Sequence, residues 1–223
     1  MAGKIKTRDR ILATALALFN EDGESRVSTV DIAAALGISP GNLYYHFHGK
    51  EEIIEQLFAD FEAELRQVLI APADRSLSLE DHWIFIYIVF EEIHDFRFFY
   101  ESPSPVIDRC PSLGPRFQRL IALKRATLDL MLANLEQDGA LGFAPGERIA
   151  LAERMTAHLV FWLPYRRLAG GDQAERAVIH EGVRQAVLQT GPYVVGDRAR
   201  WREAIDAHFA EEMRKSSKSK PAR

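Results

Sequence analysis

The residues with the clearest capacity for specific contacts lie in one short segment near the N-terminus. Asn42 carries an amide, a group that can make a bidentate contact with the edge of a base. Gly41 lets the backbone approach a partner closely because it has no Cβ. Pro40 and Tyr44 offer apolar surface that suits the methyl group of thymine. These groups predict recognition of a nucleic acid rather than bond-breaking chemistry.

Two short helices joined by a tight turn are predicted to position these groups. Ser28 is a good N-cap for the first helix, and Asp31 stands where a capping-box acid would sit. The apolar face of this helix is expected to consist of Val30, Ile32, Ala33 and Leu36. Gly37 ends the helix, Ser39 caps the next one, and Pro40 suits its first turn. This pattern is typical of a helix-turn-helix, which places its second helix in the DNA major groove.

The segment closely resembles the DNA-binding region of the tetracycline-repressor (TetR) family. The similarity covers roughly residues 5–60. Its most specific parts are Thr-Val-Asp-Ile-Ala-Ala-Ala-Leu-Gly-Ile-Ser at 29–39, Gly-Asn-Leu-Tyr-Tyr-His-Phe at 41–47 and Gly-Lys-Glu-Glu at 49–52. The resemblance implies a DNA-binding domain followed by a helical domain for ligand binding and dimerisation.

The resemblance also implies a role for individual side chains. It directs four residues toward bases: Pro40, Gly41, Asn42 and Tyr44. It assigns contacts with the phosphate backbone to Thr29, Ser39, Tyr45, His46 and Lys50. Leu43 and Phe47 are expected to turn inward. The alternative is that the serines only cap their helices and that one of the two tyrosines packs internally.

Basic side chains gather at the N-terminus although the whole chain is acidic. The net charge of −4 gives no overall basic footprint, which argues mildly against a nucleic-acid partner. A net-acidic protein can still bind DNA when its basic groups lie on the docking face. We therefore expect Lys6 and Arg8 to contact phosphate or the minor groove, and a solvated arm is the alternative.

The predicted second helix, residues 40–47, contains no Arg, Gln or Glu, so few strong base contacts are available. Specificity is then expected from DNA shape and from a second copy of the site in a homodimer. The predicted partner is double-stranded DNA with a palindromic operator, whose half-sites lie about one helical turn, ~34 Å, apart or more.

Composition excludes several other classes of protein. Cys110 is the single cysteine, so neither a disulfide framework nor a cysteine-based metal site is expected. The longest apolar run, residues 83–90, is far too short to span a membrane. The N-terminus lacks the apolar segment of a signal peptide. We therefore expect a cytoplasmic protein with no membrane association, no metal and no cofactor.

The spacing of apolar residues predicts an all-α fold. A helix-turn-helix domain is expected over residues 1–49, a helical effector-binding and dimerisation domain over 50–214, and a disordered basic tail over 215–223. The second domain should begin with a long helix from Lys50 and include a central helix that runs to about Tyr100. No segment alternates with period two, so no sheet is predicted.

Two aromatic stripes in the second domain are candidates for a ligand pocket. Spacings of three and four residues place Trp83, Tyr87, Phe90, His94 and Phe98 on one stripe, and His158, Phe161, Trp162 and Tyr165 on another. Such stripes are more often core than pocket. The resemblance implies a pocket in this domain, for a small hydrophobic or amphipathic effector. From the two stripes we expect its ligand-binding residues to be Trp83, Tyr87, Phe90, His94, Phe98, His158, Trp162 and Tyr165. If Glu91 or Asp95 faced this pocket, a cationic effector would be favoured; a solvated helix end is the simpler interpretation.

Self-association is expected through the helices near 147–168 and 172–190. The second of these has Val178, Gly182 and Ala186 at four-residue spacing, which permits close helix approach. A further helix over 197–214 could join this interface, cover it, or pack on its own subunit.

The leading hypothesis is a transcriptional repressor that an effector releases from its operator. There are two alternatives: an activator, and a DNA-binding regulator with a packed core and no effector. A helical enzyme or lipophilic carrier is disfavoured because no nucleophile motif, phosphate loop or metal cluster is visible. Only His94 with Asp95 or Glu91 could form an acid–base pair, so we do not expect an enzyme.

Overall fold

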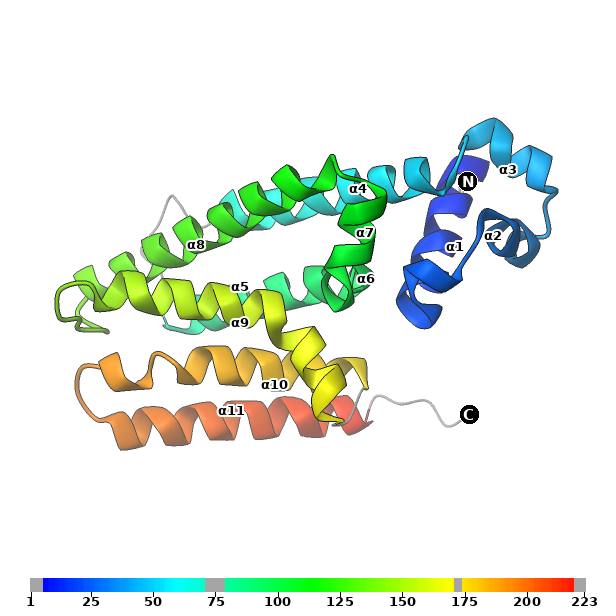
Figure 1. Ribbon diagram of the computed structural model, residues 1–223. Helices are drawn as coiled ribbons and strands as arrows, with labels where there is room; N and C mark the ends of the chain where they lie inside the picture. Colours follow the sequence, from blue (N-terminus) through cyan, green and yellow to red (C-terminus); the bar gives the residue numbers. More distant parts are fainter. Residues whose placement is uncertain (1–5, 71–78, 171–173, 219–223) are drawn as a thin grey trace. The chain divides into compact units, whose positions relative to one another are not determined.

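The computed structural model describes residues 6–70, 79–170 and 174–218, and these residues are almost entirely helical (Figure 1). No strand occurs among them, and Leu141 and Val194 form a single isolated antiparallel bridge. The all-α prediction is confirmed. The helices are α1 Thr7–Asp22, α2 Thr29–Leu36, α3 Pro40–His46, α4 Lys50–Ile70, α5 Leu79–Asp95, α6 Phe98–Glu101, α7 Pro103–Arg109, α8 Leu113–Gln137, α9 Glu147–Ala169, α10 Glu175–Leu188 and α11 Arg198–Lys218, with 3-10 turns η1 Glu24–Arg26 and η3 Gly191–Tyr193.

The central helix ends earlier than the sequence predicted. It stops at Asp95, and the short helices α6 and α7 follow. The cause is a group of aromatic side chains that are all buried: Phe96, Phe98, Phe99 and Tyr100. In a continuous helix these side chains would point in directions spread around the whole circumference, because each residue turns the helix by about 100°. At the other end of the chain, α11 continues through residues 215–218 of the predicted tail, and residues 219–223 lie outside the described part.

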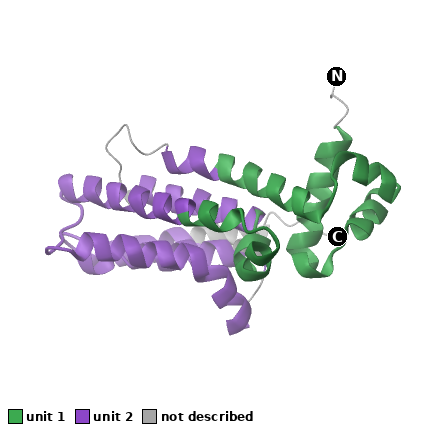
Figure 2. Ribbon diagram, turned by 45° about the horizontal axis from the view of Figure 1, so that its top comes forward, with its two compact units in different colours: residues 1–64, 96–118 green, residues 65–95, 119–223 purple. Residues whose placement is uncertain are grey.

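The chain divides into two compact units (Figure 2). The first unit consists of residues 1–64 and 96–118, and the second of residues 65–95 and 119–223. The unit that contains α1, α2 and α3 therefore also includes most of α4, all of α6 and α7, and the start of α8. The boundary predicted from the sequence was at residues 49–50.

An aromatic cluster forms the core of the first unit. Phe58 and Phe61 on α4 contact Phe99 at centroid distances of 5.1 and 5.9 Å, and Phe117 lies 4.7 Å from Phe58. The pairs that Phe58 makes with Phe99 and with Phe117 are edge-to-face, and such pairs each contribute about 1 kcal/mol beyond the area they bury. Arg116 covers the Phe58 ring at 4.7 Å and pairs with a carboxylate of α4. The cluster therefore ties α6 and the start of α8 to α4.

Close contact with α10 organises the second unit. A Cβ on Gly182 would lie 2.7 Å from Trp162 Nε1 and 2.8 Å from Phe90 Cε1, so only glycine fits here. The Trp162 indole N–H donates to the Val178 carbonyl at 2.8 Å. The small residues predicted for dimer contact, Val178, Gly182 and Ala186, are thus buried inside their own subunit.

Two basic side chains, those of His82 and Lys124, are fully buried in the second unit. His82 lies on α5, and neither of its ring nitrogens has a hydrogen-bond partner in the described part of the chain. Burial lowers the pKa of His82 from 6.5 to about 4. Burial likewise lowers the pKa of Lys124 on α8 from 10.5 to about 7. Each group therefore lowers the free energy of unfolding as the pH falls from its ordinary pKa to its folded pKa, and the loss persists at lower pH.

The pKa of His82 predicts loss of stability in acid. Between pH 6.5 and about 4 the unfolded chain binds a proton that the folded chain does not, so the free energy of unfolding should fall by about 3 kcal/mol as the pH falls. Lys124 acts over a separate interval, between about pH 10.5 and 7. Replacement His82→Leu should reduce the loss between pH 7 and 4.5, measured by urea unfolding.

The exposed imidazole of His48 supplies the matched control, because His48→Leu should keep the wild-type acid dependence. An acid dependence that is the same in His82→Leu and wild type would contradict the assignment.

Candidate nucleic-acid interface

The first helix of the helix-turn-helix begins with a reciprocal cap. The Asp31 N–H donates to Ser28 Oγ at 3.3 Å, and the Ser28 N–H donates to the Asp31 carboxylate at 2.8 Å. The hydrogen bond from the Ser28 hydroxyl, followed by that from its backbone, lowers the pKa of Asp31 below its ordinary value. The predicted capping box is confirmed.

The turn between the helices has the predicted geometry. Gly37 has φ 66° and ψ 34°, a left-handed conformation that favours glycine, and its N–H donates to the Ala34 carbonyl at 3.1 Å. Ser39 Oγ accepts the Asn42 N–H at 3.2 Å, and Pro40 occupies the first turn of α3. Satisfied caps at both sides of the turn set where α3 begins.

The α3 helix presents one exposed face and one buried face. Leu43 and Phe47 are buried, as predicted. Tyr45 is 81% exposed and Tyr44 is 60% exposed. Also exposed are the remaining residues predicted to reach bases: Pro40, Gly41 and Asn42. The structure therefore brings the predicted base-reading residues together on one accessible surface, which we call the α3 face (Pro40, Gly41, Asn42, Tyr44 and Tyr45).

Gly41 faces open space in this surface. A Cβ at this position would meet only Ser39 Oγ, at 4.0 Å. Gly41 is also absent from the glycines with positive φ. Neither sterics nor backbone conformation requires glycine here, so the folded chain itself places no demand on this position.

Histidine rings support the two exposed tyrosines. The His48 ring lies 5.1 Å from the Tyr44 ring, and the His46 ring lies 5.2 Å from the Tyr45 ring, both edge-on. Ser39 is exposed and Thr29 is half-buried at the start of α2. Lys6 is exposed at the start of α1.

Two predicted phosphate-binding cations make internal contacts instead. The Lys50 ammonium donates to the Glu24 carbonyl at 2.6 Å and lies 2.8 Å from the Glu24 carboxylate. The Arg8 guanidinium donates to Gln56 at 2.8 Å and stacks over the Phe47 ring at 4.8 Å. Because these internal contacts occupy both cations, we do not propose Lys50 and Arg8 as DNA contacts.

The sequence analysis missed the carboxylate that holds Lys50. The Glu24 side chain is 4% exposed and also lies 2.9 Å from Arg109 Nε on α7. Arg109 in turn donates to Glu51 at 3.1 Å. The hydrogen bond with Glu51, and next the charge of Glu24, raise the pKa of Arg109. No local pattern marks a glutamate in a short turn as buried, so only the folded structure identifies this ionic cluster (Glu24, Lys50, Glu51 and Arg109).

The predicted ligand-binding residues do not form one pocket. Phe98 lies in the first unit, where its ring contacts Phe19 at 5.2 Å and Phe99 at 4.0 Å. His94 is buried on α5. Glu91 and Asp95 are both exposed, as the simpler interpretation of these acids predicted. The other predicted residues divide between two hollows of the second unit.

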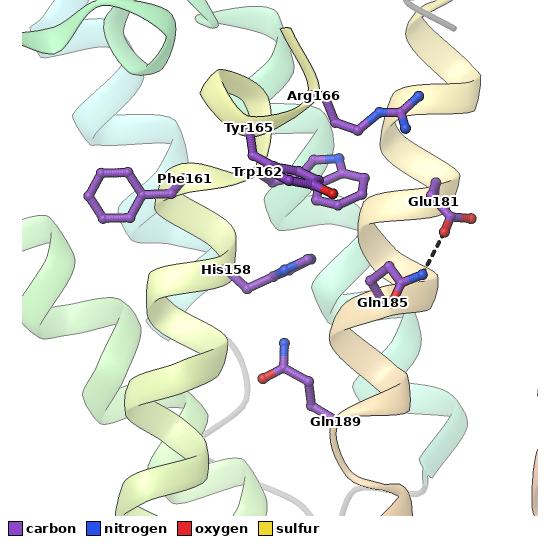
Figure 3. A pocket seen from close by; sticks show the side chains of 8 residues that line it. All are labelled: His158, Phe161, Trp162, Tyr165, Arg166, Glu181, Gln185 and Gln189. Carbon is purple, nitrogen blue, oxygen red and sulfur yellow. Dashed lines mark hydrogen bonds between the residues drawn. The ribbon is translucent and has the colours of Figure 1, made fainter. Parts of the chain in front are cut away.

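The first hollow is a groove between α9 and α10 with a volume of about 480 Å³ (Figure 3). Phe90 is not one of its lining residues, but its ring lies 5.9 Å from that of His158, which is. Phe161 points away from the other labelled side chains. We call this hollow the α9/α10 groove, and its lining is His158, Phe161, Trp162, Tyr165, Arg166, Glu181, Gln185 and Gln189.

The second hollow has a volume of about 310 Å³ and lies between α5, α10 and α11. We call it the aromatic cavity, and its lining is Trp83, Ile84, Tyr87, His180, Val183, His208 and Phe209. Of the predicted ligand-binding residues, it contains Trp83 and Tyr87. The remaining members were not predicted from the sequence: Ile84 lies beside Trp83 on α5, and the others come from α10 and α11.

No group of three potential metal ligands occurs in the described residues. In the same part of the chain, no helix is long and apolar enough to cross a membrane.

Comparison with known proteins matches both parts of the chain. A family model described as "Bacterial regulatory proteins, tetR family" matches residues 11–57, and one described as "Bacterial transcriptional repressor" matches residues 60–200. A TetR-family transcriptional regulator from Marinobacter aquaeolei VT8 is 30% identical, with a TM-score of 0.81, over 93% of this chain and 98% of that chain. The chain belongs to the TetR family. The resemblance seen in the sequence is confirmed.

Other proteins are similar over shorter lengths or in fold alone. The transcriptional repressor KstR2 of Rhodococcus jostii (strain RHA1) is 34% identical over 83 residues, which are 35% of this chain and 41% of that protein. The match thus spans less than half of this curated relative. A SmeT–triclosan complex has a TM-score of 0.56 at 19% identity, over 86% of this chain and 93% of that chain, a likeness of fold only.

Glu24 and Glu51 both pair with Arg109, but we expect their replacement to lower the free energy of unfolding by very different amounts. Replacement Glu24→Ala leaves Lys50 buried without its charge partner and should lower the free energy of unfolding by about 3 kcal/mol. Replacement Glu51→Ala removes a half-exposed carboxylate and should cost less than about 1 kcal/mol. Urea unfolding of both variants measures the difference. Equal losses would show that burial of Glu24 is not the deciding factor.

Proposed function

We propose that this TetR-family protein is a homodimeric repressor that binds a palindromic operator in double-stranded DNA through α3. The observation that carries this proposal is the α3 face, a capped and accessible surface on which Pro40, Gly41, Asn42, Tyr44 and Tyr45 are all exposed. An effector would release the protein from DNA. Because the proposed target is chromosomal DNA, we place its action in the cytoplasm.

The α3 face supports recognition by a small number of contacts. Asn42 can bond to adenine in the major groove, and Tyr44 and Pro40 can contact thymine methyl groups. The hydroxyls of Tyr45 and Ser39 are suited to phosphate oxygens, and so are Thr29 and His46, which the family resemblance assigns to the DNA backbone. Lys6, one of the basic residues near the N-terminus, is suited to the same role. With few base contacts per subunit, two symmetric half-sites and DNA shape would supply the remaining specificity.

The exposed apolar face of α9 supports a second copy of the chain as partner. Phe161, Tyr165 and Leu168 follow one another at helical spacing and are 62%, 60% and 88% exposed. The polar residues of the adjacent α9/α10 groove, such as Gln185 and Gln189, offer hydrogen bonds across an interface. A two-fold axis would place the same surface on both subunits, as a closed dimer requires.

Release by an effector follows from a difference in affinity between two conformations. A compound that binds better to the conformation unsuited to the operator shifts the population away from DNA. One fold relative, SmeT, is named as a complex with triclosan, which supports a small-molecule effector for this chain. We do not propose an enzyme, because the family and its relatives are named as regulators.

Replacement Gly41→Ala separates folding from DNA binding. Alanine removes the entropic cost of a helical glycine, so the free energy of unfolding should rise by about 0.5–1 kcal/mol. The added methyl group would stand between α3 and the bases, so operator affinity should fall at least about tenfold, equivalent to 1.4 kcal/mol. The operator is first identified by genome-wide capture, and affinity is then measured by fluorescence anisotropy.

Gly114→Ala is the matched control, because Gly114 also lies in a helix and its added Cβ makes ordinary contact. It should leave operator affinity unchanged. Wild-type affinity in folded Gly41→Ala, or a footprint without two-fold symmetry, would contradict the proposal.

The proposed dimer interface is tested by introducing charged residues at exposed apolar positions of α9. Replacement Leu168→Glu together with Phe161→Glu would bury unpaired charges twice in a two-fold interface. The dissociation constant of the dimer should rise at least about 100-fold, measured by analytical ultracentrifugation. Leu130→Glu on α8 changes another exposed leucine and should leave the dimer intact. A variant that stays dimeric would contradict this interface.

A further inference from the structure

The aromatic cavity has no role in the proposed contacts with DNA or with a second subunit. Its volume of about 310 Å³ lies at the lower end of the range of about 300–1,000 Å³ that is usual for small-molecule sites. The lining comes from three helices of the second unit, α5, α10 and α11. It therefore suits a small ligand enclosed within one subunit.

Flat rings form most of the wall. The Trp83 ring lies 5.4 Å from the His208 ring and 6.4 Å from the Phe209 ring. On the side formed by α10, the Tyr87 ring meets the His180 ring at 5.4 Å, edge-on. Offset-stacked and edge-to-face contacts favour a ligand that is itself a planar aromatic.

The polar groups of the lining restrict the charge of the ligand. No aspartate, glutamate, lysine or arginine is among the described residues that line the cavity, so they offer no charged partner to a cation or a strong anion. The Trp83 indole N–H has no hydrogen-bond partner among the described residues. The imidazoles of His180 and His208 add groups that can donate or accept. An uncharged oxygen, as a hydroxyl or carbonyl, is the ligand group that complements this set.

We propose that the aromatic cavity is the effector site and that the effector is an uncharged planar aromatic compound bearing a hydroxyl or carbonyl oxygen. This inference rests on the proposed effector-responsive repressor. The α11 helix supplies His208 and Phe209, so it forms one wall of the site.

The test uses the full chain and three probes of similar ring size: 1-naphthol, naphthalene and 1-naphthylmethylammonium. Titration calorimetry measures binding to the protein alone, and anisotropy with the captured operator measures release from DNA. We expect 1-naphthol to bind at least about tenfold more tightly than the other two probes and to lower operator affinity. Equal binding of the three probes, or stronger binding of the ammonium compound, would overturn the assigned ligand class.

Cavity-filling variants connect binding to this site. Val183→Trp fills the cavity from α10 and should weaken 1-naphthol binding at least about tenfold. Ile84 is a half-exposed lining residue on α5, and Ile84→Trp narrows the cavity from that side. This second variant provides the test if Val183→Trp does not fold. Gln189→Ala alters the α9/α10 groove and should leave 1-naphthol binding unchanged.

The two readouts separate this inference from the proposed function. Binding of 1-naphthol that both filled variants retain would overturn the site. Binding at the cavity without release of the operator would overturn its role as the effector site. Failure of the wild-type protein to bind any operator would instead overturn the proposed function, and the calorimetric result would still decide whether the cavity holds this ligand.

Discussion

A buried carboxylate between two cations is the constraint on which the first unit depends. An ionised glutamate can be held away from water only if its charge is compensated nearby, and Lys50 and Arg109 do this for Glu24. The Glu24–Lys50 pair joins the residues immediately before and after the helix-turn-helix. It thereby closes a loop around α2 and α3, while Arg109 adds the end of α7 to the same point. The position of the accessible α3 surface thus depends on an electrostatic contact that is itself largely buried.

The sequence was sufficient to predict the local geometry of the helix-turn-helix. The caps at Ser28 and Ser39 and the left-handed turn at Gly37 depend on residues within a few positions of one another, so a single helix pattern contains the information. The family resemblance assigned Lys50 to phosphate, and the basic N-terminus suggested phosphate or the minor groove for Arg8. Their partners, Glu24 and Gln56, are distant along the chain and are identified only when the helices pack.

The candidate ligand site shows a different limit of sequence reasoning. Helical spacing correctly grouped His158, Trp162 and Tyr165 on α9, where the rings are 5.0 and 5.8 Å apart. Periodicity specifies which side chains share a face, but not which helix covers that face. Trp83 and Tyr87 therefore meet α10 and α11 in one cavity, whereas Phe98 falls beyond a helix break that its buried aromatic neighbours enforce. His82 and Lys124 were missed because their burial depends on neighbours from other helices.

The exposed apolar side chains of α9 affect how promoter occupancy depends on the amount of the protein. A subunit on its own would keep Phe161, Tyr165 and Leu168 in water, and exposed apolar surface of this kind favours association. When pairing precedes DNA binding, the abundance of the active species rises with the square of the subunit concentration at low abundance. Occupancy of a promoter would then respond more steeply than linearly to synthesis of the protein, and a modest fall in expression would empty the site.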